Sequence, residues 1–272
     1  MRWLCPALIA LSMTLASCDG GSSPPAGDVP IIRDTFQDDF ESAQSESDLF
    51  PLDGSGWTGR QRVPETNGID LTAERSRSGR QSMRFRAAPT ADGATSKADL
   101  VLERFDLAEG DRVWFEFWIY VVGGTDTRNV FVWDLEAPET CTDETSCPSA
   151  GDGSICPSPG RRLFLGGAQG GEWTSDLGKW CRGDPFRAGV STLVTDRWVR
   201  LRIAVDLSSD ASGRFRVWQD DAQVLDATGI TLPRPDARYS RLQIGITANG
   251  NEQSPNELFL DDVTVTLSDP GW

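Results

Sequence analysis

The sequence predicts an all-β fold, an antiparallel β-sandwich of the jelly-roll type. Short segments of alternating apolar and polar residues recur along the chain, and clusters of Gly, Asp, Ser, Asn and Pro separate them. Such alternation is typical of strands joined by turns. No segment keeps a helical spacing of apolar residues over three turns. Many short strands without helices favour a sandwich or jelly roll.

The N-terminal residues 1–17 have the features of a lipoprotein signal peptide. Arg2 precedes an apolar run over residues 4–16, which is too short to span a bilayer as a mature helix. The letters LASC at residues 15–18 resemble the bacterial lipobox, in which small residues precede a Cys that takes a diacylglycerol. We therefore expect an exported protein of the cell envelope, anchored by a lipid on Cys18 in either the inner or the outer leaflet. The alternative is an ordinary signal peptide in which Cys18 is incidental.

Residues 18–33 are expected to form a flexible tether, because residues 19–30 are dense in Gly, Ser and Pro and lack apolar periodicity. A single domain of ordinary size then occupies residues 34–272. No later segment is apolar over the length needed to cross a bilayer. The lipid is therefore the only membrane anchor that the sequence supports.

The predicted strands of this domain begin after residue 80 and continue to the C-terminal region. The strongest covers residues 112–122, RVWFEFWIYVV, in which apolar core positions alternate with Trp, Glu and Tyr. The others cover residues 82–87, 100–103, 129–135, 162–165, 198–207, 213–219, 223–226, 241–247 and 257–267.

The balance of charged residues narrows the classes of function. The chain has 26 Lys and Arg against 41 Asp and Glu, a formal net charge of −15. So acidic a chain is a poor candidate for binding nucleic acid or anionic lipid surfaces. The chain contains no His, which excludes a Ser-His-Asp triad, a Cys-His pair and an imidazole base. Catalysis would therefore depend on carboxylates, Tyr, Lys, Arg or a metal.

Four cysteines remain beyond the signal peptide and Cys18, and all four lie in segment 137–189. An even number in an exported protein predicts two disulfides, for which three connectivities are possible. A zinc site is the alternative, but the segment has no CxxC pair and no His could complete a ligand set. We interpret 137–189 as an insertion stapled by disulfides, which is either a functional loop or a decoration. The cysteines are Cys141, Cys147, Cys156 and Cys181.

Alternation along the predicted strands separates a core face from a second face of aromatic, Arg and Gln side chains. Aromatic rings stack on the apolar face of a sugar, while Arg and Gln bind its hydroxyls or a carboxylate. This second face is therefore a candidate glycan-binding surface if the strands share a sheet. The alternative is a solvated face on which Arg stems pack against Trp. The candidate ligand-binding residues are Trp118, Tyr120, Arg200, Arg202, Arg216, Trp218 and Gln243.

Both ends of the domain resemble those of the concanavalin A-like lectin and glucanase group. The start reads DDFES at residues 38–42 and GW at 56–57, and the end reads LFLDDVTV at 258–265. The resemblance implies a jelly roll whose first and last strands lie together and whose carboxylates hold a structural calcium ion, a cation that prefers oxygen ligands. The alternative is that acidic strand ends simply reflect an acidic protein. The implied calcium ligands are Asp39, Glu41, Asp261 and Asp262.

Residues 75–265 also resemble the heparin-lyase and alginate-lyase branch of this group. The matching segments are RSGRQSMRF at 77–85, KADL at 97–100, TDRW at 195–198, GRFRVW at 213–218 and YSRLQIGI at 239–246. The resemblance implies a polysaccharide lyase for a uronate-containing glycan. In such lyases Tyr or His takes the proton next to the uronate carboxylate, and Arg or Gln neutralises that carboxylate. The residues implied are Tyr120 as base, Arg200 or Arg216 as neutraliser, and Gln243 in support.

Two departures from that branch bear on activity. The chain has no His to act as base, and Ile246 follows Gly245 where the alginate-lyase strand carries a Tyr. The glucanases of the group instead use paired carboxylates on one strand. Asp134, Glu136 and Glu139 match that pattern only in part, because its first Glu is missing.

Three functional hypotheses follow from the sequence. The first is a non-catalytic glycan-binding module, the second is a polysaccharide lyase, and the third is a structural envelope lipoprotein that contacts other proteins. The missing His favours the first over the second. A groove in which the aromatic and Arg side chains converge would favour glycan binding over the third.

Overall fold

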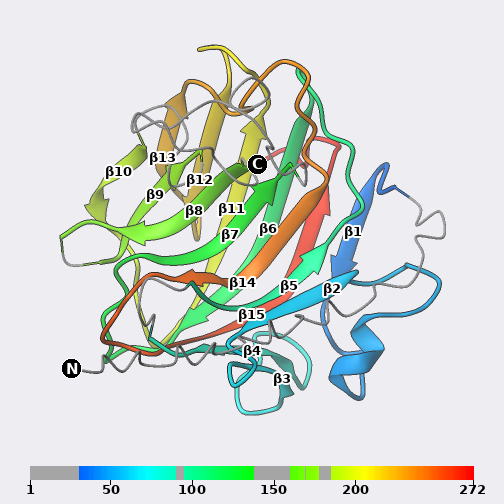
Figure 1. Ribbon diagram of the computed structural model, residues 1–272, viewed down its shortest axis with the longest axis vertical. Helices are drawn as coiled ribbons and strands as arrows, with labels where there is room; N and C mark the ends of the chain where they lie inside the picture. The colour runs from blue at the N-terminus through cyan, green and yellow to red at the C-terminus, as the bar shows by residue number, and fades with distance from the viewer. Residues whose placement is uncertain (1–30, 90–94, 138–159, 169, 178–184) are drawn as a thin grey trace, which may run out of the picture.

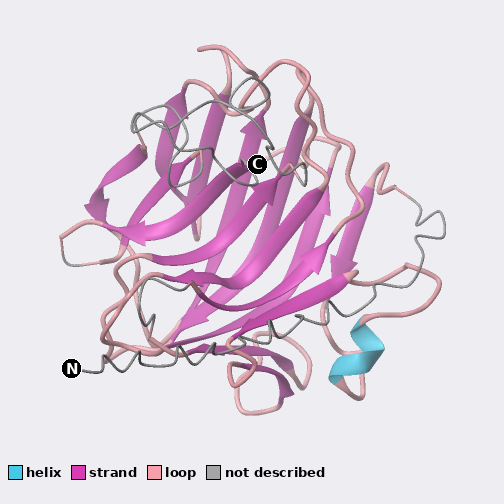
Figure 2. Cartoon of the chain, in the orientation of Figure 1, coloured by secondary structure: helices cyan, strands magenta, loops and turns pink. Residues whose placement is uncertain are grey.

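The computed structural model describes residues 31–89, 95–137, 160–168, 170–177 and 185–272. Strands dominate this part of the chain, and its one helix, η1 (Glu46–Leu49), is a single 3-10 turn (Figure 2). No helix of these residues is long and apolar enough to cross a membrane.

The strands form two antiparallel sheets that lie one behind the other in Figure 1. Sheet A contains, in spatial order, β13 (Ala222–Thr228), β12 (Arg214–Gln219), β11 (Trp198–Asp206), β6 (Arg112–Val121), β15 (Asn256–Thr266), β4 (Ser82–Ala87) and β3 (Gly68–Thr72), with β1 (Thr35–Asp38) also paired to β15. Sheet B contains β10 (Phe186–Ser191), β9 (Glu172–Asp176), β8 (Gly160–Gly166), β7 (Val130–Glu136), β14 (Arg241–Asn249), β5 (Ser96–Leu102) and β2 (Gly59–Val63).

The core lies between the two sheets and is built from the inward positions of each strand. Leu201 of β11 pairs with Phe117 of β6, and both side chains are fully buried. From the opposite sheet, the Trp133 ring meets the Phe115 ring edge-on at a centroid distance of 4.9 Å. Because successive strand residues point to opposite faces, the residues between these core positions must occupy the outer faces of the sandwich.

The predicted fold class is confirmed, since two antiparallel sheets enclose one core. Five strands were not predicted from the sequence: β1, β2, β3, β9 and β10. These strands have only four to six residues, and β2 reads GRQRV. A short and polar strand gives too few apolar alternations to be recognised before its neighbours are known.

The segment 137–189, predicted as an insertion, contributes strands to sheet B. It supplies β8 and β9 and the start of β10, which extend the sheet beyond β7. The signal peptide, Cys18 and all four cysteines predicted to form disulfides lie outside the described residues. At the predicted end of the tether, Ile32 is buried, and its backbone N–H donates to the carbonyl of Arg104 over 2.8 Å.

Strand β14 is irregular at its centre. Its pairing with β7 passes from Ile244 opposite Trp133 to Ala248 opposite Phe131, so that three residues of β14 face one residue of β7. Gly245 lies in this bulge with φ of +130°, and a Cβ there would come within 2.8 Å of a core ring and of a backbone oxygen of β5. Only glycine fits such a position without displacing its neighbours.

Candidate active site

Six of the seven residues predicted to bind a ligand lie together on the outer face of sheet A. They come from adjacent strands: Arg200 pairs with Trp118, and Arg202 pairs with Trp218. Gln243 is the exception, because β14 belongs to sheet B. The prediction of one shared face must therefore be corrected, since Gln243 is separated from the others by the core. The six are Trp118, Tyr120, Arg200, Arg202, Arg216 and Trp218.

The arginines on the outer face of sheet A are engaged with neighbouring side chains. Arg202 Nε donates to Glu116 Oε2 over 2.9 Å. The Arg77 guanidinium lies over the Trp118 ring, 4.0 Å from its centroid. Further ion pairs join Arg200 to Asp221, Arg214 to Asp226 and Arg216 to Asp206. Acid–base pairing with Arg stacked on Trp is the arrangement expected of a solvated sheet face.

Neither tyrosine can act on a ligand that Gln243 contacts. Tyr120, on the outer face of sheet A, is 8 % exposed and packs against two other aromatic rings. Tyr239 is fully buried, and its hydroxyl donates to the Thr231 carbonyl over 2.8 Å. Burial raises the pKa of Tyr239. A lyase site that combines Tyr120 with Gln243 cannot form in this fold, because the two lie on opposite sheets.

The carboxylates predicted to bind calcium hold a loop by accepting backbone hydrogen bonds. Asp261 Oδ2 accepts from the N–H groups of residues 77 and 78 over 2.7 and 3.2 Å. Glu41 Oε1 accepts from those of residues 80 and 81 over 2.7 and 2.9 Å. Within the described ranges, no three Cys, Asp or Glu side chains are grouped so that they could hold a metal ion. Calcium binding by Asp39, Glu41, Asp261 and Asp262 stays a prediction.

The outer face of sheet B carries polar side chains that are buried. On β7, Asp134 and Glu136 alternate with core residues and are 4 % and 8 % exposed. On β14, Gln243 and Thr247 are 1 % and 0 % exposed. Charged and amide groups rarely lie so deep unless they are paired or functional. We call this set the sheet B cluster: Gln61, Lys97, Asp99, Asp134, Glu136, Arg162, Asp176, Arg241, Gln243 and Thr247.

Strand pairing arranges the sheet B cluster in rows. One row crosses β9, β8, β7 and β14 through the direct partners Asp176, Arg162, Asp134 and Gln243. A neighbouring row crosses β14, β5 and β2 through Gly245, Asp99 and Gln61. Alternate residues of a strand share a face, so the rows lie side by side.

The Gln243 amide joins a cation to a carboxyl group at the centre of the cluster. Lys97 Nζ donates to Gln243 Oε1 over 3.4 Å and to Gln61 Oε1 over 3.0 Å. The other end of the amide, Gln243 Nε2, donates to Glu136 Oε2 over 2.7 Å. Lys97 and Glu136 are thereby fixed on the two ends of one side chain.

Two further contacts hold the cluster on the side of β8 and β9. Arg162 binds Asp176 through two parallel hydrogen bonds of 2.9 Å, a geometry that orients both groups. Thr247 Oγ1 donates to Asp134 Oδ1 over 2.9 Å. The bulge in β14 allows this second contact, because Asp134 is the direct partner of Gln243.

Burial shifts the titration of the two carboxyl groups on β7. Desolvation raises the pKa of Glu136 to about 7, and the neighbouring Asp134 adds to the shift. Desolvation likewise raises the pKa of Asp134 to about 6, against the opposing charges of Arg162 and Lys97. A carboxyl group that titrates near neutrality can serve as a general base or acid.

Sequence reasoning identified part of this site by other routes. Asp134 and Glu136 were noted as an incomplete glucanase motif, and Lys97 and Asp99 through the lyase-like KADL segment. Glu139, the third member of the glucanase pattern, lies outside the described residues. Gln61, Arg162 and Asp176 were missed.

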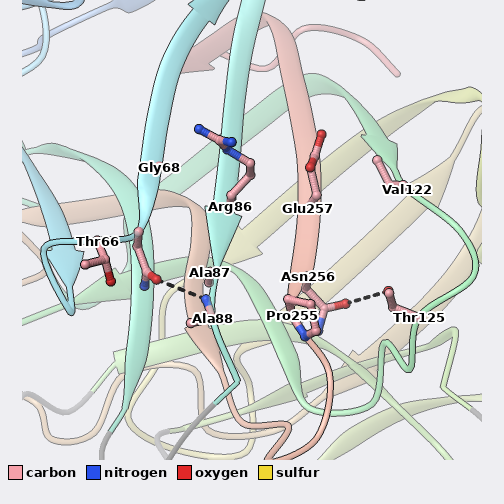
Figure 3. Close-up of a pocket in the computed structure, with 11 residues that line it drawn as sticks. Thr66, Gly68, Arg86, Ala87, Ala88, Val122, Thr125, Pro255, Asn256 and Glu257 are labelled. Carbon is pink, nitrogen blue, oxygen red and sulfur yellow. Dashed lines mark hydrogen bonds between the residues drawn. The ribbon is translucent and has the colours of Figure 1, made fainter.

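A cavity of about 350 Å³ lies elsewhere, near the ends of β3, β4 and β15 (Figure 3). The side chains of Arg86 and Glu257 extend in the same general direction beside it in Figure 3. Asn67, which lines the cavity, has a structural role, because its Oδ1 accepts a hydrogen bond from the backbone N–H of Ala88 over 3.0 Å. No residue of the sheet B cluster lines this cavity, so the two are separate.

Comparison with known structures identifies proteins that share this fold. An endo-β-1,4-glucuronan lyase from the fungus Trichoderma reesei matches with a TM-score of 0.60 and 15 % identity, covering 78 % of this chain and 92 % of that one. The cellulose induced protein Cip1 matches with a TM-score of 0.54 and 14 % identity, covering 85 % and 97 %. The alginate lyase vAL-1 from Chlorella virus matches with a TM-score of 0.51 and 10 % identity, covering 82 % and 98 %. At these identities the likeness establishes the fold alone.

The sequence itself matches a family. No curated protein sequence matches the chain. The family model described as polysaccharide lyase, however, matches residues 51–264, which is most of the domain and includes the whole sheet B cluster. The chain therefore belongs to the polysaccharide lyase family.

Proposed function

We propose that this protein is a polysaccharide lyase that cleaves a uronate-containing glycan on the outer face of sheet B. The observation that carries the proposal is the Gln243 amide, which holds Lys97 on one end and Glu136 on the other. A lyase needs these two groups together, because a cation neutralises the uronate carboxylate while a base removes the adjacent proton. Family membership, and the activity named for the glucuronan lyase of the same fold, support this choice.

The reaction is a β-elimination in which Glu136 acts first as base. Its Oε2 accepts the hydrogen bond from Gln243, which leaves Oε1 to take the proton from C5 of the uronate. The C5–H electron pair then forms the C4=C5 double bond, and the C4–O4 bond breaks. The protonated Glu136 returns its proton to O4, so that one carboxyl group serves as base and acid. Lys97, steadied by Gln61 and Gln243, neutralises the uronate carboxylate.

A second candidate is glycan binding without cleavage at the same cluster. It is favoured by the tyrosines and by the absence of His. Tyr120 lies on the opposite sheet, and the hydroxyl of the fully buried Tyr239 already donates to the Thr231 carbonyl. A buried row of amides and charges can bind sugar hydroxyls and carboxylates whether or not a base is in place. The outer face of sheet A remains a weaker site for glycan, because its arginines are engaged in ion pairs.

The cellular setting is proposed from the sequence. We propose that residues 1–17 are removed, that Cys18 carries a lipid, and that the domain acts in the cell envelope. Calcium at the domain ends is proposed on the same footing. Treatment with a signal peptidase II inhibitor and mass spectrometry of the mature N-terminus would test the lipid, and calorimetric titration with calcium would test the ion.

The decisive experiment is an elimination assay with two matched variants. Purified protein is incubated with glucuronan, alginate and a neutral glucan, and the ultraviolet absorbance of the unsaturated uronate is followed. Glu136→Gln should lower kcat by roughly 100-fold or more, the effect expected for removal of a general base. Glu116→Gln, which alters an ion-paired glutamate of sheet A, should leave the rate unchanged.

The pH profile gives a second readout of the same proposal. Glu136 must be ionised to accept a proton, so the rate should rise with pH as this group titrates around its raised pKa of about 7. Binding of a uronate glycan without any new absorbance would instead select the non-catalytic candidate. Equal losses in the Glu136→Gln and Glu116→Gln variants would contradict the assignment of the base.

A further inference from the structure

Asp99 is the one carboxyl group in the described part of the chain whose two oxygens are both buried without a hydrogen-bond partner. Its side chain is 0 % exposed. Buried polar groups nearly always have a partner, and leaving one unpaired costs stability. An unpartnered carboxyl group at this depth, on the same face as the proposed catalytic residues, therefore points to a partner that comes from outside the protein.

The register of β5 places Asp99 beside the path of Lys97. The two residues are alternate members of β5 and share its outer face. Asp99 pairs with Gln61 on one side and with Gly245 on the other, and Gly245 has no side chain to fill the space. The Lys97 ammonium reaches Gln61 and Gln243, so its side chain must run along β5 past Asp99. A carboxylate bound by Lys97 would lie next to Asp99.

The charges that face Asp99 favour its protonated form. Burial raises the pKa of Asp99 well above its usual range, and Asp134 and Glu136 of β7 act in the same direction. Lys97 of β5 and Arg241 of β14 oppose the shift without cancelling it. Gln61 of β2 carries no charge. A protonated carboxyl group is a hydrogen-bond donor, whereas a carboxylate can only accept.

We infer that Asp99 is a neutral carboxylic acid that donates a hydrogen bond to the carboxylate of the uronate bound at Lys97. This inference rests on the proposed function and adds a catalytic residue to it. Negative charge moves onto the uronate carboxylate as the C5 proton leaves, so a donor fixed at that position binds the transition state more tightly than the substrate. Lys97 contributes the charge, and Asp99 contributes the short directional bond.

The test separates stability from activity by replacing Asp99 with an apolar and with an amide side chain. Asp99→Leu removes a buried unpaired polar group and should raise Tm at pH 8. The same change should lower kcat/KM on the cleaved glycan by roughly 100-fold, the effect of losing one donor to a developing negative charge. Asp99→Asn keeps a donor of similar shape and should retain activity within about tenfold of the wild type.

A matched control comes from Ser175, whose buried hydroxyl also lacks a partner but faces the core side of β9. Ser175→Ala should not lower kcat/KM, which shows that removing an unpaired polar group from sheet B is harmless in itself. The pH profile adds a second criterion. The wild-type rate should fall again at alkaline pH as Asp99 loses its proton, and Asp99→Asn should lack this fall.

Infrared spectroscopy of the protein without glycan tests the inference independently of activity. At pH 8, where Glu136 and Asp134 are mostly ionised, the carbonyl band of a protonated carboxyl group should be present in the wild type and strongly weakened in Asp99→Asn. An absent band, full activity in Asp99→Leu, or equal inactivity in Asp99→Asn and Asp99→Leu would overturn the inference while leaving Glu136 as base. If the wild-type protein cleaved none of the uronate glycans, the proposed function itself would be contradicted.

Discussion

The outer faces of sheets A and B are built from the same kinds of side chain but differ in how deeply those side chains are buried. On sheet A, Arg214 and Asp226 form an ion pair with side chains 42 % and 37 % exposed. The Arg214 hydrogen bond lowers the pKa of Asp226. On sheet B, burial raises the pKa of Glu136, although Lys97 and Arg241 oppose the shift.

The difference shows how surroundings decide the role of a charged residue. Exposed pairs are screened by water and contribute little to folding or to chemistry. Buried carboxyl groups hold their protons at neutral pH and are costly to ionise. The Arg and acidic side chains around Trp118 and Trp218 on sheet A thus form a surface of ion pairs. Asp261 of the same sheet is an exception, because it is fully buried and burial raises its pKa to about 6. Sheet B holds two buried carboxyl groups whose pKa values are raised to about 6 and about 7.

The largest expected effect comes from exchanging a cation on each face. Lys97→Met removes the charge proposed to neutralise the substrate and should lower kcat/KM by about 100-fold, as expected for a lost charge contact to the reacting group. Arg202→Met removes an ion-paired cation of sheet A and should leave kcat/KM unchanged. Steady-state kinetics on both variants measures the contrast, and equal losses would erase the functional distinction between the sheets.

A smaller effect is expected on the pH dependence of stability. The folded pKa of Glu136 is raised from 4.5 to about 7, so between these values the folded state keeps a proton that the unfolded state has lost. The free energy of unfolding therefore falls as pH rises through this window. Glu136→Gln cannot ionise, and it should become more stable than the wild type by roughly 1–3 kcal/mol at pH 8.

Chemical denaturation at pH 4 and pH 8 measures this difference. The Glu136→Gln variant should gain stability only at the higher pH, where the wild-type carboxyl group is ionised. A variant that gains nothing at pH 8 would mean that Glu136 ionises freely in the folded protein. Its assignment as a base that titrates near neutrality would then fail.

The smallest effect is expected for an ion pair of sheet A. A double-mutant cycle on Arg214 and Asp226, whose side chains are 42 % and 37 % exposed, should give a coupling energy of about 0.2–1 kcal/mol, the range typical of solvent-accessible pairs. The coupling should shrink in concentrated salt because the charges are screened. A coupling of several kcal/mol would show that this face is less solvated than its exposure indicates.

The sequence was sufficient to predict the fold because both sheets alternate strongly in their central strands. Residues 112–122 and 198–207 separate core from surface without any knowledge of their partners. The candidate site was harder to predict, since the alternation of apolar and polar residues is the same whether the outer face is exposed or buried. The aromatic and Arg residues beside Trp118 were therefore predicted to bind a ligand, whereas the acids beside Trp133 matched only part of a glucanase pattern.

The pairing between distant strands could not be predicted from the sequence either. Three strands carry Gln243, Lys97 and Glu136, and the order of these strands along the chain does not show that they are neighbours in the sheet. The sequence singled out each of these residues for a different reason, and only the strand register shows that Lys97 and Glu136 both contact the Gln243 amide. Asp176 was not predicted because β9 is short and polar. Arg162 lies in a predicted strand, but its role depends on Asp176, its direct partner across β8 and β9.

The bulge in β14 has a consequence for how the length of this strand can vary. It adds two residues relative to β7 but only one relative to β5, because Ile246 pairs with Ala98 and Asn249 with Ser96. A deletion of Gly245 and Ile246 would therefore leave β14 out of register with β5, and it would also remove Ile246, a fully buried side chain of the core. Because the same bulge brings Thr247 to Asp134, the length of this strand is constrained by the core and by the candidate site together.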